Sequence, residues 1–130
     1  GKIFGSLHAE VPSDCDMLHI HDTIDLIEKE IKDKLGIDIS IHMDPVLIGD
    51  ELTENLKTET AKILNGISAE LTFHDFRIVT GPTHTNLIFD VVIPYDLKLS
   101  ENEIKEQIDS ALNTGETQYF TVITFDRSYT

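Results

Sequence analysis

The sequence predicts an α+β protein built from two small units in tandem. Three observations support this prediction: runs in which apolar residues alternate, runs in which they recur every three or four positions, and a strand–helix–strand order that occurs twice. The first unit, residues 1–48, is expected to be strand–helix–strand. The second unit, residues 49–130, is expected to be helix–strand–strand–helix–strand.

The first unit has a clear change of hydrophobic period along the chain. Residues 2–11 alternate between apolar and mostly polar side chains, which is typical of a half-buried strand. Residues 17–35 carry apolar residues at steps of three and four, which predicts an amphipathic helix, and Gly36 is placed to end it. Residues 38–44 alternate again, and Pro45 ends this second strand.

The second unit opens with an additional helix and strand. Residues 51–65 have the pattern of an amphipathic helix, which Gly66 is expected to close. Residues 69–79 and 84–94 then predict two strands, separated by a Gly-Pro-Thr turn at 81–83.

The chain ends with a further helix and strand. The helix is expected at 101–113, where Ser100 and Glu103 have the spacing of a capping box. A last strand is expected at 118–125.

The two units share an internal duplication. The segment from Leu7 aligns without a gap with the segment from Phe89, 82 residues later, and IHMDP aligns with ITFDR from Ile123. The helix and strand of residues 51–79 have no counterpart before the first copy, so the first unit is expected to be truncated at its N-terminus. Each unit is expected to be ferredoxin-like, with its helices on one face of its sheet and the other face covered within the chain or across a dimer.

The composition favours metal cations over nucleic acid as partners. The 130 residues include 24 acidic and 10 basic side chains, which gives a formal net charge of -14. A negative field of this size repels the phosphates of nucleic acids and of anionic lipids and attracts cations. Cys15 is the only cysteine, so an internal disulfide and a multi-cysteine zinc motif are excluded. No stretch has the pattern of a membrane span or a signal peptide, so any membrane part is expected upstream.

The first unit contains a group of metal-ligating residue types. His42 and Asp44 lie two positions apart in a strand, so both project from its polar face, and His8 lies on the polar face of the other strand. His21 lies at the edge of the helix's apolar stripe, whereas His19 points away. Imidazole and carboxylate groups are ligands for zinc, iron and manganese. The pattern is also compatible with solvated side chains that bind no metal.

Several motifs of the first unit resemble the cytoplasmic C-terminal domain of cation diffusion facilitators, a family of divalent metal exporters. The resemblance covers roughly residues 2–46 and rests on HAEVP, HIHDTIDLIEKEI, LGI and IHMDP. It implies that His8, His21, His42 and Asp44 bind metal. The segment HDFRIVTGPT of residues 74–83 resembles the strand that opens the family's domain, which implies His74 as a further ligand.

The resemblance also implies a function and partners. We expect a cytoplasmic regulatory and dimerisation domain that binds zinc, or iron or manganese, forms a homodimer and modulates an upstream transmembrane domain of the same protein. In the second copy the ligand positions become Asp90, Glu103, Thr124 and Asp126. We interpret that copy as degenerate, because Glu103 belongs to the capping box and threonine is a poor ligand.

Two alternative functions remain open from the sequence. The first is a structural dimerisation module in which metal plays no part, which the degenerate second copy favours for residues 51–130. The second is an enzyme, since the His-Asp pairs at 21–22 and 74–75 are also found in metal phosphohydrolases. The sequence argues against the enzyme, because it has no phosphate-binding glycine loop and Cys15 has no positioned base.

Overall fold

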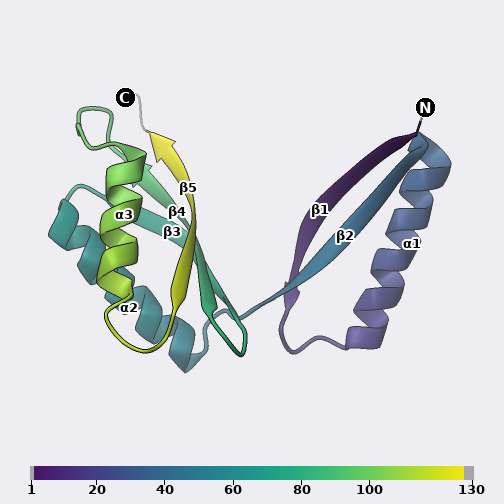
Figure 1. Cartoon of the computed structure of the whole chain (residues 1–130), viewed down its shortest axis with the longest axis horizontal. Coiled ribbons are helices and arrows are strands. Elements are labelled where there is room, and N and C mark those ends of the chain that lie inside the picture. The colour runs from purple at the N-terminus through teal and green to yellow at the C-terminus, as the bar shows by residue number, and fades with distance from the viewer. Residues whose placement is uncertain (1, 128–130) are drawn as a thin grey trace. The chain divides into compact units, whose positions relative to one another are not determined.

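The computed structural model describes residues 2–127 and confirms the α+β class, with three helices and two sheets among the described residues (Figure 1). The chain divides into two compact units, Gly1–Val46 and Leu47–Thr130, called unit 1 and unit 2 below. No helix in the described part of the chain is long and apolar enough to cross a membrane.

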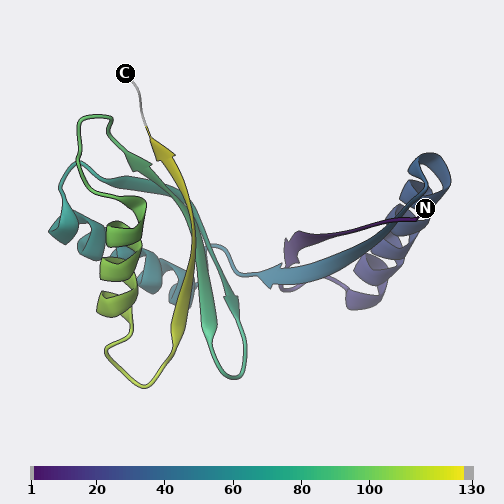
Figure 2. The ribbon, with the colours of Figure 1, turned by 45° about the horizontal axis from the view of Figure 1, so that its top comes forward.

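Unit 1 is a single strand–helix–strand motif. Strands β1 (Ile3–Pro12) and β2 (Ile37–Val46) are parallel neighbours, and helix α1 (Met17–Leu35) connects them. The helix lies along one face of the two-stranded sheet, as Figure 2 shows. Gly36 ends it in a left-handed conformation at φ 68°, which glycine adopts without steric cost, as the sequence predicts.

The core of unit 1 is thin. Among its described residues only Val11 and Val46 are buried, and α1 buries none of its side chains. The apolar stripe of the helix therefore covers the sheet only partly, and Met17 and Leu35 remain 57% and 66% exposed.

Unit 2 is a three-stranded sheet with two helices on one face (Figures 1 and 2). Its elements are α2 (Glu51–Ile67), β3 (Thr72–Thr80), β4 (Thr85–Ile93), α3 (Glu101–Leu112) and β5 (Tyr119–Arg127). The strand order is β3-β4-β5, in which β4 is antiparallel to β3 and parallel to β5.

The core of unit 2 lies between this sheet and its helices. Alternate residues of β4 are buried, from Thr85 to Ile93, while those between them are half-buried on the opposite face. Helix α3 contributes Ile104, Ile108 and Leu112 to the core, and the Ser100 hydroxyl accepts a hydrogen bond from the Glu103 amide at its start, as the capping box predicts.

The predicted end of α2 is wrong. Gly66 does not close the helix, because Ile67 is its last residue. Ser68 is the C-cap, and its amide donates a hydrogen bond to the Leu64 carbonyl. The helix continues because Ile63 and Ile67 pack against the core of unit 2, and this burial outweighs the weak helix propensity of a single glycine. The next strand consequently begins at Thr72, three residues later than predicted.

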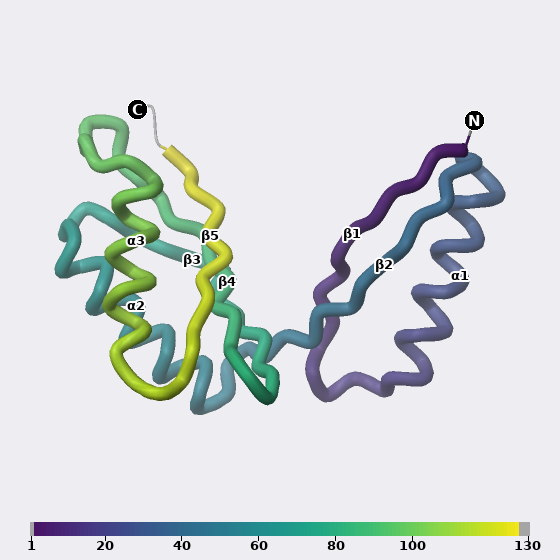
Figure 3. Tube along the Cα trace, in the orientation of Figure 1, coloured from purple at the N-terminus to yellow at the C-terminus, as the bar shows by residue number. Residues whose placement is uncertain are grey.

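The two parallel strand pairs have the same register, which supports the internal duplication. Ile3 pairs with Ile37 in unit 1, and Thr85 pairs with Tyr119 in unit 2, so partners are 34 residues apart in both sheets. Figure 3 shows that β1-α1-β2 and β4-α3-β5 follow the same strand–helix–strand path. Unit 2 adds α2 and β3 to this repeated motif.

Candidate metal centres

The register of the first sheet brings His8 and His42 together. The two residues are direct partners across the parallel strands β1 and β2, so their side chains project from the same face. Their ring centroids lie 5.2 Å apart, with an interplanar angle of 31°. Both side chains are exposed, and they belong to the polar face that strand alternation predicts.

Asp44 completes this group, called cluster 1 below and defined by His8, His42 and Asp44. It lies two positions after His42 on β2, and its two carboxylate oxygens are 3.2 and 3.3 Å from Nδ1 of His8. The side chains of His8 and Asp44 are 67% and 35% exposed, so an ion can reach them from solvent. Imidazole and carboxylate are donor types that zinc accepts. The donor atoms of these three residues do not all lie within 4.8 Å of one another in this structure.

His21 is not joined to cluster 1. It is exposed near the start of α1, and no hydrogen bond, ion pair or ring contact links it to these three residues in the described part of the chain. Its charge acts instead on Asp25, one helical turn away. The Lys29 ammonium is the main cause of the lowered pKa of Asp25, through a hydrogen bond and its charge, and His21 contributes a smaller effect in the same direction.

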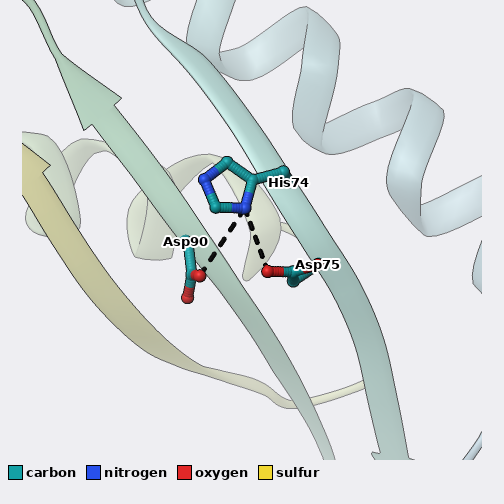
Figure 4. Close-up of side chains that lie close together, drawn as sticks. All are labelled: His74, Asp75 and Asp90. Atoms are coloured by element: carbon teal, nitrogen blue, oxygen red, sulfur yellow. Dashed lines mark hydrogen bonds and ion pairs between the residues drawn. The ribbon is translucent and has the colours of Figure 1, made fainter.

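A second group of ligand types lies in unit 2 and is called cluster 2, defined by His74, Asp75 and Asp90 (Figure 4). Each residue offers a ligand atom, and these atoms lie within 4.8 Å of one another. Nδ1 of His74 is 3.0 Å from an Asp75 oxygen and 3.6 Å from an Asp90 oxygen. His74 comes from β3 and pairs with Asp90 of the central strand β4.

Sequence reasoning identified only part of cluster 2. It named His74 as a ligand and Asp90 as the counterpart of His8, but it did not bring them together, and it did not select Asp75. A cross-strand pairing of the two predicted strands around the turn at 81–83 would have placed His74 near Asp90. Of the other counterpart positions, Thr124 on β5 is the direct strand partner of Asp90. Glu103 lies in the first turn of α3, and Asp126 is exposed on β5, where it pairs with Val92.

One family model matches the chain, and it covers residues 1–46. Its description is the cytoplasmic domain of a cation efflux protein. Unit 1 is similar to this family's domain. The match ends at Val46, the last residue of unit 1, so the matched segment and the structural unit coincide. No curated protein and no solved structure matches the chain.

Proposed function

We propose that the chain is the cytoplasmic regulatory and dimerisation part of a divalent metal efflux transporter, and that cluster 1 is its metal sensor. The observation that carries this proposal is the pairing of His8 with His42, with Asp44 beside them, inside the unit that matches the cation efflux cytoplasmic domain. The ligand chemistry suits zinc first, and iron or manganese next.

Exposed apolar surface on unit 1 supports the dimerisation part of the proposal. Several large apolar side chains of this unit are more than half exposed, which is unusual for the surface of a monomeric soluble protein. They are Ile3, Phe4, Met17, Leu18, Leu26 and Leu35. The name of the matching family also describes a dimer, and a homodimer would cover such surface.

Regulation follows from linkage between metal binding and assembly. The chain has a formal net charge of -14, so two copies repel each other, and bound cations reduce that repulsion. Metal that binds more tightly to the dimer, or to one arrangement of it, shifts the population toward that arrangement. In the full transporter such a shift would reach the transmembrane domain on the cytoplasmic side of the membrane.

The test is to titrate the full chain with zinc and to measure binding by calorimetry. The dimer fraction is measured separately by light scattering after size-exclusion chromatography. We expect saturable zinc binding and a larger dimer fraction in zinc than in chelator. The structural alternative, a module that dimerises without metal, predicts the same dimer fraction in both conditions. Zinc binding without any saturation would contradict the sensor.

A further inference from the structure

We propose that the side chains of Asn113 and Lys105, called the edge plug below, keep β5 from pairing edge to edge with β5 of a second copy of the chain. In the described part of the chain β5 pairs with β4 alone, so its other edge is open to a further strand. The inference goes beyond the proposed function, because it involves neither metal nor unit 1 and concerns an association that the fold prevents.

The register of β5 shows which of its backbone groups point outward. The Thr85 amide donates a hydrogen bond to the Gln118 carbonyl, and Thr85 is the strand partner of Tyr119. In a parallel ladder this arrangement directs the even residues of β5 to β4 and turns the amides and carbonyls of the odd residues toward the open edge. The outward residues are Tyr119, Thr121, Ile123, Phe125 and Arg127.

Asn113, the C-cap of α3, occupies the first outward position in the way that a strand would. Its Oδ1 accepts a 2.8 Å hydrogen bond from the Tyr119 amide, and its Nδ2 donates a 2.9 Å hydrogen bond to the Tyr119 carbonyl. One residue of an antiparallel strand supplies the same acceptor and donor. Nδ2 also donates to the Asp109 carbonyl at 2.8 Å, so both of its hydrogens are used and the helix holds the side chain in place.

Lys105 blocks the second outward position. Its Nζ donates to the Thr121 carbonyl at 3.0 Å and to the Thr121 hydroxyl at 2.8 Å. Its third hydrogen bond, of 3.1 Å, goes to an Asp109 carboxylate oxygen, so all three donors of the ammonium group are used. A lysine at a sheet edge is one of the means by which natural proteins prevent edge-to-edge pairing, because its charge must lose water when a second strand approaches.

Unit 1 blocks its own edge strand with a different residue. In the described part of the chain β2 pairs with β1 alone, and the Ile41 amide of β2 donates a 2.9 Å hydrogen bond to the Glu28 carboxylate of α1. At the offset of 82 residues Glu28 corresponds to Ser110, so neither residue of the edge plug is its counterpart. The two copies of the motif therefore block the same edge with unrelated side chains, which favours a function for the blocked edge over an accident of one helix.

The centre of the avoided contact follows from the part of the edge that stays open. Among the described residues no side chain bonds the outward amides and carbonyls of Ile123 and Phe125. Two copies related by a two-fold axis at Thr124 would pair antiparallel, with Ile123 of each copy opposite Phe125 of the other. The edge plug stops this ladder at Thr121, which leaves a contact shorter than a stable strand pair requires.

The experiment measures self-association of the full chain in chelator by sedimentation velocity over a range of protein concentrations. The variants are Asn113→Ala, Lys105→Met and the double variant, and methionine keeps most of the apolar stem of lysine while it removes the donors. Asn65→Ala and Lys62→Met are the matched controls, because they remove the same groups from exposed positions of α2.

We expect the double variant to self-associate at least tenfold more tightly than the wild type, each single variant to change in the same direction by less, and the controls to leave association unchanged. Thr124 is exposed on β5. Adding Thr124→Lys to the double variant should restore the wild-type association, because two lysines would lie opposite each other at the centre of the strand pair.

Thermal unfolding checks the fold of each variant, and the single variants decide the question if the double variant does not fold. Folded plug variants that self-associate no more than the wild type would overturn the inference. Tighter association that persists after Thr124→Lys would also overturn it, because the contact would then lie outside β5. A dimer formed by unit 1 is the same in wild type and variants, so failure of the proposed function and failure of this inference give different results.

Discussion

At the scale of single residues, strand parity decides which ligands meet. His8, Asp44 and His42 all occupy even positions, and the 34-residue offset between paired residues is even, so all three side chains share one face. Sequence alternation predicts the shared face within each strand. The parallel register that makes His8 and His42 direct partners comes from the structure, because nothing in the two patterns fixes their relative shift.

The sequence could not predict the position of Asp75 in cluster 2. Alternation assigns adjacent residues to opposite faces, so His74 and Asp75 cannot share a face in a regular strand. Only the bulge brings them together, and bulges have no strong sequence signal away from glycine. His21 shows the converse case, since helical spacing predicts it near the sheet but the structure leaves it without a contact to cluster 1.

Substitutions in cluster 1 give the most direct residue-scale prediction. We expect His42→Ala or Asp44→Ala to remove most saturable zinc binding, by more than about tenfold in affinity, because each deletes one of only three donors. His19→Ala should leave binding nearly unchanged, since His19 lies exposed on α1. Calorimetry on the four proteins measures this. Equal losses in His19→Ala and His42→Ala would show diffuse binding to an acidic surface.

Zinc binding should also depend on pH. Imidazole binds metal only when it is neutral, and histidine side chains ordinarily take up a proton between pH 7.5 and pH 5.5. We therefore expect zinc to raise the unfolding temperature of the chain clearly at pH 7.5 and much less at pH 5.5. Thermal unfolding with zinc and with chelator at both pH values measures the effect. The same zinc shift at both values would indicate that carboxylates alone bind the ion.

At the scale of secondary-structure elements, local signals predicted the starts of helices better than their ends. Ser100 caps α3 as its spacing indicates, because capping depends on neighbours within one turn. The end of α2 depends instead on Ile67 reaching the core, which is a tertiary effect. A glycine near a helix end is therefore a reliable stop only where it takes a left-handed conformation, as Gly36 does and Gly66 does not.

The start of α2 offers an element-scale test. Thr53 is 1% exposed, and its hydroxyl donates a hydrogen bond to the Asp50 carboxylate at the N-cap, which lowers the pKa of Asp50. A carboxyl group whose pKa is lower in the folded state than in the unfolded state stabilises the fold at pH values above the pKa of the unfolded state, about 3.9 for aspartate. This stabilisation is lost as the pH falls through the pKa of the folded state. We expect Thr53→Val to lower the unfolding temperature of unit 2 by roughly 4–8 °C at pH 7, the value of one net hydrogen bond.

The effect of Thr53→Val should shrink as the pH falls below the unfolded pKa of Asp50, because protonation weakens the same bond in the wild type. Thr58→Val is the matched control, since the hydroxyl of Thr58 bonds only the Glu54 carbonyl of its own helix at an exposed position. Thermal unfolding of the three proteins at pH 7 and pH 3 measures both points. A control that loses as much stability as Thr53→Val would mean that helix propensity, rather than the cap, causes the change.

At the scale of the whole molecule, the duplication produces two units with unequal cores. The strand–helix–strand motif is common to both, but within residues 2–127 only unit 2 has a third strand and a second helix against it. Ile78, Phe89 and Ile104 are fully buried there, whereas unit 1 buries only Val11 and Val46 among its described residues. Apolar burial is the main source of stability. The stability of unit 1 therefore depends more than that of unit 2 on a bound metal ion or a bound second copy of the chain.

Amide hydrogen exchange tests whether unit 1 is less stable than unit 2. We expect the amides of β1 and β2 to exchange much faster than those of β4, because β4 is hydrogen-bonded on both sides and covered by the core. In the described part of the chain β1 is paired only with β2. Zinc at 100 times its dissociation constant stabilises a folded site by about 2.7 kcal/mol, which corresponds to roughly 100-fold slower exchange by unfolding of that site. We therefore expect zinc to slow the amides of unit 1 selectively, and His42→Ala to remove this protection. Mass spectrometry on the full chain measures both units at once. Equal protection of β1 and β4 without metal would mean that unit 1 is stabilised by contacts other than its own core, and zinc protection that persists in His42→Ala would place the ion outside cluster 1.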